Sequence, residues 1–491
     1  MNFTFVSIYN LVQFKVTVMV KYPIQFKMDS TMAKTKIEYI IEFIIEKISN
    51  KTLIVGSRLP SVRQFSKQMN CSVSTVVEAY ARLVAEGVLE SRVGSGYYIL
   101  GPRPTYFTHE CDFNYQREVD PLWISKQSLE EKYQALKPGC GWLPETWMPE
   151  QTIRKSLKLA AKSETAVLMN YAVPHGHLAL RQLIARKKEI YDLNVHPNQI
   201  LITDSATQSI DLIFRLLLNA GDVILIDDPC YFNFQALIKT HKLKAITIPF
   251  THSGPDVEKF TEALLLKPKL YLTNTGIHNP TGAILTLQTA YQIAKLAEDS
   301  NLIIIEDEIF ADFEYTPAPR YASFSGFEHV IQLGSYTKTL SAAVRCGYII
   351  SSLDLIDQLI NLRISTNFSN SNLNAEIIYQ ALMDTSYPKH IDWLKKQLIK
   401  ATKETIHKLE ALNIHPWIIP KAGIFIWCKL PHGIGASQLS QQCLKHNMIL
   451  APGKAFSQSE LADQYMRFNV AQCIDKKVFD ILDVAMKELM P

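Results

Sequence analysis

From about residue 141 onward, short apolar runs alternate with stretches that have the period of a helix. The apolar runs include DVILIDDP at 222–229, KLYLTN at 269–274 and NLIIIED at 301–307. Each run ends in a turn that precedes a helical pattern, and this order predicts a parallel or mixed sheet with helices on both faces. Long helices and two further apolar runs follow, which predicts a small α+β subdomain over about 385–491.

The composition excludes several classes of protein. With 491 residues, 47% hydrophobic and 20% charged, the chain is long enough for two or three globular domains and is not disordered as a whole. Its 8 cysteines are scattered without a CxxC pair, which excludes a zinc ribbon and a disulfide scaffold and indicates a reducing compartment such as the cytoplasm. No metal site is predicted. No membrane span is predicted either, because no apolar run reaches the ~18 residues that a membrane helix needs.

The first 33 residues are apolar but carry Lys15, Lys21 and Lys27. No cleavage site of small residues follows them, so a secretory signal is not expected. We expect an unstructured extension over 1–33, or a start codon placed too early.

Residues 34–100 form a separate helical module with a basic bias. Ten Lys or Arg residues and six Glu residues between positions 34 and 103 account for the whole net charge of +4. A local basic bias on a small helical module is typical of phosphate contacts, but solvated helix faces often carry the same pattern. The charge therefore needs support from the order of the residues around it.

That order predicts a helix-turn-helix with a wing. Ser61 and Ser72 are suited to cap two helices, and Asn70 permits a tight turn between them. The run VLESRVGSGYYI at 88–99 then predicts a two-stranded wing with its tip at Gly94-Ser95-Gly96. In such a motif the second helix is presented to a major groove.

The run GSRLPSVRQFSKQMNCSVSTVVEAYARLVAEGVLESRVGSG closely resembles the winged helix-turn-helix of the GntR family of regulators. The resemblance implies double-stranded DNA as a partner. The family carries Arg one residue after the helix-capping serine, and Val73 stands there in this chain, so an unusual operator is expected. The alternative is a winged helix that makes only protein contacts. The resemblance assigns the DNA contacts to Arg63, Ser74, Thr75, Arg92 and Ser95.

Pyridoxal phosphate needs a lysine for a Schiff base, a carboxylate for the ring nitrogen, an aromatic side chain that stacks on the ring, and a phosphate cradle. Each candidate residue alone is better explained by a turn, a packing contact or a solvated loop. Their order at the carboxyl ends of predicted strands, where open α/β sheets bind ligands, carries the prediction. The ordered set resembles the fold-type I aminotransferases of class I/II over residues 141–491. It comprises Ser205 to Gln208, Tyr231, Asn279 in HNPTG, Asp307, and Ser335 to Lys338 with Arg345 beyond.

The resemblance implies pyridoxal 5'-phosphate as the cofactor, with Lys338 as the catalytic Schiff-base lysine and Asp307 as the partner of the ring nitrogen. It further assigns Asn279 to the ring oxygen and Tyr231 to the ring face. Arg467, in MRFNVA, is assigned to the α-carboxylate of the amino compound. The phosphate is assigned to Ala206, Thr207, Ser335 and Arg345, with Tyr171 reaching the phosphate of the neighbouring subunit in the family's dimer.

Two positions depart from the aminotransferase pattern. Ser205 stands where the family has a glycine in its phosphate turn. Phe310 stands where class I enzymes carry a tyrosine, three residues after Asp307, and the phenol of that tyrosine normally donates to the ring oxygen. We therefore expect cofactor binding to be kept, while amino transfer is the property put in question.

A GntR reader joined by a linker at 101–140 to an aminotransferase-like body resembles the MocR-type regulators. The resemblance implies a homodimer whose second domain binds the cofactor and an amino acid or amine, and thereby alters how the paired readers meet DNA. The first hypothesis is thus a transcription factor that senses an amino compound or the vitamer. The second is a working aminotransferase with an attached DNA module, and the third is a scaffold without cofactor. Phe310 favours the first.

Overall fold

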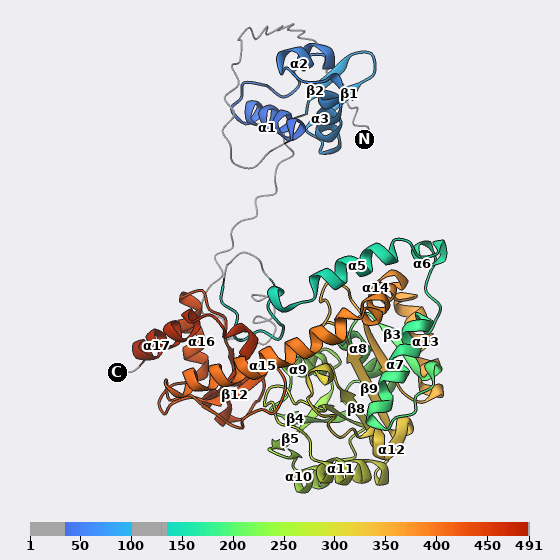
Figure 1. The fold of residues 1–491 in the computed structure, drawn as a ribbon, viewed down its shortest axis with the longest axis vertical. Coiled ribbons are helices and arrows are strands. Elements are labelled where there is room, and N and C mark those ends of the chain that lie inside the picture. Colours follow the sequence, from blue (N-terminus) through green and yellow to red (C-terminus); the bar gives the residue numbers. More distant parts are fainter. Residues whose placement is uncertain (1–34, 101–128, 130–134, 490–491) are drawn as a thin grey trace, which may run out of the picture. The chain divides into compact units, whose positions relative to one another are not determined.

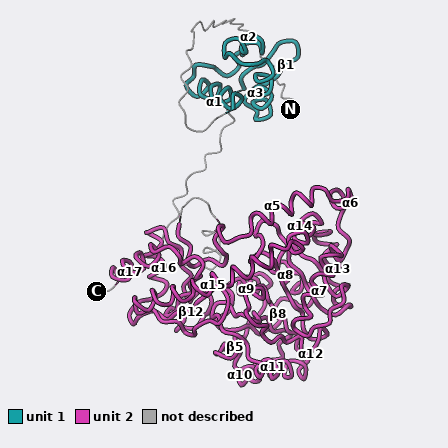
Figure 2. The backbone as a smooth tube through the Cα atoms, in the orientation of Figure 1, with its two compact units in different colours: residues 1–115 teal, residues 116–491 magenta. Residues whose placement is uncertain are grey.

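The computed structural model describes residues 35–100, 129 and 135–489 of the chain (Figure 1). The chain divides into two compact units, residues 1–115 and 116–491 (Figure 2). The expected extension at 1–33 and most of the expected linker lie outside the described residues. Within the described ranges, no helix is long and apolar enough to cross a membrane.

The described part of the first unit is a small helical bundle with a hairpin. The side-chain oxygens of Ser61 and Ser72 accept hydrogen bonds from the backbone at Gln64 and Thr75, so both predicted helix caps are confirmed. Asn70 has a φ of 48°, the left-handed conformation that closes the turn between the second and third helices. The elements are α1 (Lys36–Ser49), α2 (Val62–Gln68), α3 (Val73–Ala85), β1 (Leu89–Arg92) and β2 (Gly96–Ile99).

Tyr80 of α3 lies at the centre of this unit. It has no exposed surface, and its ring centroid lies 5.6 Å from that of Phe65 and 4.9 Å from that of Tyr97. Its hydroxyl donates to the carbonyl oxygen of Pro60 at 3.2 Å. These contacts join α2, α3 and the wing into one core, which fixes the wing against the helix-turn-helix.

The second unit is built on an eight-stranded sheet with the order β3-β10-β9-β8-β7-β4-β5-β6. The run from β5 through β4, β7 and β8 to β9 is parallel, as the apolar runs predict. Strand β10 lies antiparallel between β3 and β9 and makes the sheet mixed. The strands are β3 (Ile200–Thr203), β4 (Val223–Asp228), β5 (Lys244–Thr251), β6 (Gly254–Pro255), β7 (Leu270–Asn274), β8 (Ile303–Asp307), β9 (Val330–Ser335) and β10 (Gly347–Ile350).

Helices cover both faces of this sheet (Figure 1). On one face α8, α9 and α13 pack on strand residues such as Ile224 and Ile305. On the other face α7, α10, α11, α12 and α14 pack on the intervening residues, such as Leu225 and Ile304. The helices are α5 (Glu150–Ala160), α6 (Thr165–Met169), α7 (Leu178–Lys188), α8 (Ala206–Leu217), α9 (Phe232–Thr240), α10 (Val257–Leu264), α11 (Leu287–Asp299), α12 (Ala322–His329), α13 (Leu353–Asn367) and α14 (Asn372–Met383).

The chain after residue 385 forms an α+β subdomain with its own apolar core, around a sheet of order β11-β12-β14-β13. Residues 136–139, predicted as linker, pair with it: the Leu136 N–H donates to the Asn447 carbonyl and the Gly139 N–H to the Ile449 carbonyl. These residues therefore belong to the second unit rather than to a linker. The elements are α15 (Ser386–Glu410), β11 (His415–Pro416), β12 (Phe425–Lys429), α16 (Ala436–Lys445), β13 (Ala451–Pro452), β14 (Tyr465–Asn469) and α17 (Lys477–Leu489).

Candidate functional site

The carboxyl ends of the central strands and one strand of the subdomain bring several predicted cofactor residues together. Asp307 ends β8, Asn279 follows β7, and Lys338 comes three residues after β9. Arg467 of β14 reaches this edge, where its Nη1 donates to Asn279 Oδ1 at 2.8 Å. Burial raises the pKa of the Tyr231 hydroxyl, and both Arg467 and Asp307 lie close enough to influence it. The structure thus gathers five of the predicted residues, which we call the strand-end cluster: Tyr231, Asn279, Asp307, Lys338 and Arg467.

Asp307 is a buried carboxylate held by neutral donors. The Asn274 amide donates to its Oδ2 at 3.0 Å and the Ile309 N–H to its Oδ1 at 3.2 Å. Burial raises the pKa of Asp307 to about 7, against the opposing effects of the Ile309 N–H, the Lys338 charge and the Asn274 amide. Among the described residues, no lysine or arginine donates a hydrogen bond to it. The carboxylate is therefore desolvated without a cation in direct contact.

The ammonium group of Lys338 loses its proton more readily than that of an ordinary lysine. Loss of surrounding water lowers the pKa of its ammonium to about 8, and the positive charges of Arg467 and Arg345 act in the same direction. Its Nζ donates to the carbonyl oxygen of Gly141 at 2.6 Å and lies 5.8 Å from the centroid of the Phe310 ring. A neutral amine is the form that attacks a carbonyl, so this environment suits a Schiff-base lysine.

Arg467 is almost fully buried, and its guanidinium is incompletely paired. Its Nη2 donates to the Gly139 carbonyl at 2.7 Å, while its Nε has no hydrogen-bond partner among the described residues. The rings of Phe425 and Phe456 flank the guanidinium carbon at 4.1 and 4.6 Å. Burial lowers the pKa of Arg467 to about 10, which leaves it charged at neutral pH. A buried guanidinium with a spare N–H is suited to a carboxylate.

The residues predicted to hold the phosphate lie at the ends of α8 and β9. Ala206 and Thr207 open α8, so their N–H groups have no acceptor within the helix. Ser205 caps the helix, its Oγ accepting from the Gln208 N–H at 3.0 Å. Ser335 ends β9 with its hydroxyl on the Cys346 carbonyl. Arg345 is exposed and contacts the carbonyl of Ala342.

Two aromatic assignments have different outcomes. The Tyr231 ring lies at the site but packs on Phe232 and Phe234 at centroid distances of 4.8 and 5.5 Å. Tyr171 is 76% exposed and lies against Phe368, with 4.6 Å between ring centroids. No contact among the described residues joins Tyr171 to the strand-end cluster.

Sequence reasoning missed the groups that accept hydrogen bonds from Lys338 and Arg467 and the amide that supports Asp307. The carbonyl oxygens of Gly139 and Gly141 accept from Arg467 and Lys338, and Asn274 supports Asp307. A backbone carbonyl leaves no side-chain signature. The available signal was the spacing of the two glycines in the phrase PGCGW, just before the α/β alternation begins.

The predicted DNA contacts lie on α2, at the start of α3 and on the wing. Arg63 is exposed on α2. The hydroxyls of Ser74 and Thr75 lie 2.8 and 2.7 Å from the Ser72 hydroxyl, so they take part in the cap of α3. Val73, in place of the family's arginine, is 47% exposed at that helix start. The start of α3 is therefore uncharged.

The wing carries its own polar contacts. Arg92 donates to Glu90 at 2.9 Å and lies 4.4 Å above the Tyr98 ring, whose hydroxyl is 2.6 Å from the Ser95 hydroxyl. A phosphate would compete with Glu90 for Arg92. Arg58, which sequence reasoning did not assign to DNA, lies against the wing: a Cβ at Gly96 would come 3.2 Å from its Nε. The wing thus presents two neighbouring arginines.

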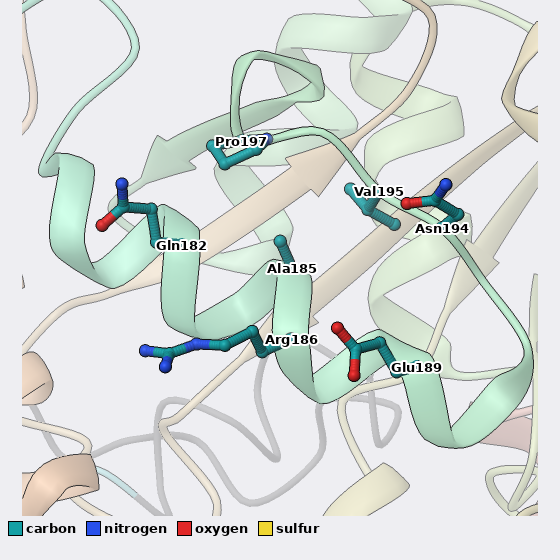
Figure 3. Close-up of a pocket in the computed structure, with 7 residues that line it drawn as sticks. All are labelled: Gln182, Ala185, Arg186, Glu189, Asn194, Val195 and Pro197. Carbon is teal, nitrogen blue, oxygen red and sulfur yellow. The ribbon is translucent and has the colours of Figure 1, made fainter.

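A surface depression of about 420 Å³ lies on α7 and the segment that follows it (Figure 3). None of the residues predicted to bind cofactor, substrate or DNA lines it. The depression therefore adds nothing to the strand-end cluster. It is lined by Gln182, Ala185, Arg186, Glu189, Asn194, Val195 and Pro197.

A winged helix followed by an α/β body with lysine, aspartate and arginine at its strand ends defines a DNA-binding regulator with an aminotransferase-like domain. Residues 145–484 match the family model for aminotransferase class I and II, and the chain belongs to that family. Residues 36–99 match the model for bacterial regulatory proteins of the gntR family. The predicted fold class and the predicted resemblance to MocR-type regulators are both confirmed.

Proteins named as HTH-type transcriptional regulators are similar to this chain over most of their length. The chain is 26% identical to the HTH-type transcriptional regulator YdfD of Bacillus subtilis, covering 92% of this chain and 97% of that protein. It is 25% identical to NorG of Staphylococcus aureus, covering 82% and 93%, and 27% identical to YdcR of Escherichia coli, covering 85% and 91%. Both relatives are likewise HTH-type transcriptional regulators.

Solved aminotransferases share the fold of the second unit. The α-aminoadipate aminotransferase LysN of Thermus thermophilus, complexed with N-(5'-phosphopyridoxyl)-L-leucine, has a TM-score of 0.65 at 21% identity, covering 72% of this chain and 92% of that one. The kynurenine aminotransferase of Pyrococcus horikoshii, in complex with PMP, has a TM-score of 0.68 at 22% identity, covering 75% and 94%. Fold and family together support the predicted cofactor, pyridoxal phosphate.

The buried Asp307 makes a prediction about stability without cofactor. Its folded-state pKa is raised to about 7, so its stabilising effect is complete below its unfolded pKa and is lost as the pH rises through 7. Between pH 5 and pH 8, Asp307→Asn should therefore lose about 3 kcal/mol less unfolding free energy than the wild type. Denaturant unfolding of cofactor-free protein measures this. The exposed Asp299→Asn should follow the wild type, and parallel curves for Asp307→Asn would contradict the prediction.

The exposed Arg63 makes a prediction about salt dependence. If its guanidinium contacts a phosphate, Arg63→Ala should weaken binding to the protein's own upstream DNA and lower the slope of log K against log salt by about 1. Fluorescence anisotropy at several salt concentrations measures the slope. Arg82→Ala, whose guanidinium is held by Glu78 near the end of α3, serves as the control. An unchanged slope for Arg63→Ala would remove Arg63 from the DNA backbone.

Proposed function

We propose that this protein is a homodimeric, cytoplasmic transcription regulator that binds pyridoxal phosphate through Lys338 and alters its DNA binding when an amino acid or amine reaches that cofactor. The observation that carries the proposal is the meeting of Asp307, Lys338 and Arg467 at one sheet edge, each incompletely paired. An assembly of buried, partly paired charges is costly unless a ligand completes it.

The residues present fit the cofactor. A protonated ring nitrogen is the cation that the buried Asp307 lacks, and the free N–H groups at the start of α8 suit a phosphate. Lys338, with its pKa of about 8, supplies the amine for the covalent bond. The cofactor itself supplies an aldehyde that captures amines and a ring that withdraws electrons. Asn279, Tyr231, Ser335 and Arg345 complete the proposed binding set, with Tyr171 contributed by the second subunit.

Arg467 determines the class of effector. It is buried, charged and carries an Nε without a partner among the described residues, which favours an anionic group such as an α-carboxylate. The flanking rings of Phe425 and Phe456 exclude water and strengthen that attraction. An α-amino acid therefore satisfies both Arg467 and the amine-capturing cofactor. An amine without a carboxylate satisfies only the latter.

Phe310 favours a sensor over a working aminotransferase. Its ring is buried, packs edge-on against Phe425 at 5.4 Å and faces the Lys338 amine. An apolar ring cannot donate to the cofactor's ring oxygen, so the electronic tuning that speeds amino transfer is absent. Turnover of about 1–10³ per second with common amino and keto acids would overturn the sensor assignment and favour the enzyme.

An exposed aromatic pair supports the homodimer. Tyr171 and Phe368 are 76% and 57% exposed, although their rings contact each other, and the neighbouring Met169 and Val173 are also exposed. Exposed apolar clusters of this kind mark protein contacts, and a second copy would cover them while placing Tyr171 at its partner's site. Sedimentation of the full chain tests the assignment.

The chromophore tests the choice of lysine. Purified protein should take up pyridoxal phosphate and acquire an absorption band that borohydride removes, because the bond to Lys338 is a reducible imine. Lys338→Ala should lack this band, while Lys400→Ala, whose side chain is exposed on α15, should keep it. Absorption spectra before and after reduction are the measurement. A reducible band in Lys338→Ala would show that another lysine holds the cofactor.

A further inference from the structure

Residues 136–142, which we call the strap, join the subdomain to the strand-end cluster. The strap begins beside the subdomain, where Leu136 forms an isolated parallel bridge with Met448. The Leu136 N–H donates to the Asn447 carbonyl at 2.9 Å, the Ile449 N–H to the Leu136 carbonyl at 2.9 Å, and the Gly139 N–H to the Ile449 carbonyl at 3.0 Å. In the sequence, the strap follows directly on the segment that comes from the winged unit.

Two carbonyls of the strap are held by the two groups that we propose to bind the effector and the cofactor. Arg467 Nη2 donates to Gly139 O at 2.7 Å, and Lys338 Nζ donates to Gly141 O at 2.6 Å. The strap is therefore hydrogen-bonded to both cations, and its hold depends on what else each of them binds. Gly139 approaches so closely that a Cβ there would come 2.4 Å from the backbone of Leu450, which leaves the strap little room to shift sideways.

A carboxylate bound to Arg467 competes with the strap. The Nε atom is buried without a partner, so a carboxylate that pairs side-on takes Nε together with Nη2. Its second oxygen then lies beside the Gly139 carbonyl oxygen, which also uses Nη2. Nη2 has two N–H groups and can donate to both oxygens, but the carboxylate neutralises the guanidinium charge that strengthens the bond to the Gly139 carbonyl. Effector binding therefore weakens the hold of Arg467 on the strap.

Asn469 fixes the strap in this position. It lies two residues from Arg467 on β14 and is fully buried. Its Nδ2 donates to the carbonyls of Cys140 at 3.0 Å and Trp142 at 2.8 Å, and its backbone N–H donates to the Pro138 carbonyl at 2.7 Å. One side chain thus holds both sides of Gly141, and its neighbour Arg467 holds Gly139.

We propose that the strap transmits effector binding toward the winged unit, and that Asn469 is the positioning residue that makes it responsive. Asn469 keeps the Gly139 and Gly141 carbonyls against Arg467 and Lys338. A ligand that binds these cations therefore changes the hydrogen bonds that hold the strap. The proposal rests on the proposed function, because it requires a carboxylate at Arg467. Linkage makes the effect reciprocal: DNA changes effector affinity by the same factor.

The decisive measurement compares two responses of the cofactor-loaded full chain. L-alanine, L-glutamate and L-lysine are titrated while the cofactor absorption is followed, and the DNA dissociation constant is measured with and without the amino acid that responds. The wild-type ratio of the two constants should lie in the range of roughly 5–150. In Asn469→Ala the absorption response should persist while the ratio falls to about 1, because the strap is no longer held at the cations.

Gln442→Ala is the matched control. Its side chain contacts Glu488 on the far helices of the same subdomain, so this variant should keep the wild-type ratio. Gly141→Ala is a second variant, because an added Cβ would lie an ordinary 3.7 Å from Lys338 Nζ and should reduce the ratio without blocking the fold. A wild-type ratio in Asn469→Ala, with the absorption response intact, would overturn the proposal.

Hydrogen exchange of the wild type provides a test that needs no variant. The responding amino acid should speed exchange of the Leu136 and Gly139 amides several-fold. The matched amines without an α-carboxylate, ethylamine, 4-aminobutanoate and 1,5-diaminopentane, should not. Unchanged exchange rates at the Leu136 and Gly139 amides would refute the role of the strap and leave the proposed effector class standing. Absence of any absorption response to the three amino acids would refute the proposed effector class, and the strap proposal with it.

Discussion

The constraint on which the second unit depends is a carboxylate buried at the end of a central strand without a cation bound to it. Within the part of the chain that the structure describes, Asp307 receives hydrogen bonds only from neutral groups, the Asn274 amide and the Ile309 N–H. Burial raises its pKa to about 7. Folding must provide the free energy for this burial, because desolvating a carboxylate costs on the order of several kcal/mol even after relaxation. The parallel strands, the close helix packing and the turn at Asn279 all serve to hold that edge in place.

The other two charges at this edge share the same incompleteness. Lys338 has a carbonyl for its partner. Arg467 has a carbonyl and an amide, and its Nε finds no acceptor in residues 35–100 and 135–489. A protein that used these groups only for stability would gain more from apolar residues of similar size. Their retention in one cluster is the physical reason to assign the cluster to a ligand with a cationic ring nitrogen, an aldehyde and an associated carboxylate.

Side-chain chemistry at the ends of strands could be predicted from the sequence, because apolar runs locate strands and parallel strands end at a common edge. Asp307, Asn279 and Lys338 were found in this way, and Ser61 and Ser72 were recognised as caps by their position before apolar stripes. Contacts that depend on the backbone could not be predicted, since every residue has a carbonyl. The roles of Gly139 and Gly141 therefore emerged only from the fold.

A second limit concerns direction and pairing. Strand β10 runs antiparallel to both of its neighbours, and this reversed orientation leaves no mark on the sequence. The resemblance to the GntR family assigned Arg92 to DNA, and the structure pairs its guanidinium with Glu90 and the Tyr98 ring. A charge count treats such an arginine as available, whereas a phosphate must first displace its carboxylate. Arg58 lies against the same wing, but a charge count gives no reason to single it out, so sequence reasoning did not assign it to DNA.

The energies involved make the strap a reasonable carrier of regulation. A hydrogen bond from a charged group contributes about 1.5–3 kcal/mol, so the bonds of Arg467 and Lys338 to the strap are each comparable to a typical coupling free energy of about 1–3 kcal/mol. Ligand contacts that replace one such bond are thus sufficient to shift an equilibrium between two arrangements of the chain. The sheet is a poorer carrier, because moving β8 or β9 would break several backbone bonds at once. Regulation through the strap requires only that side-chain bonds exchange partners.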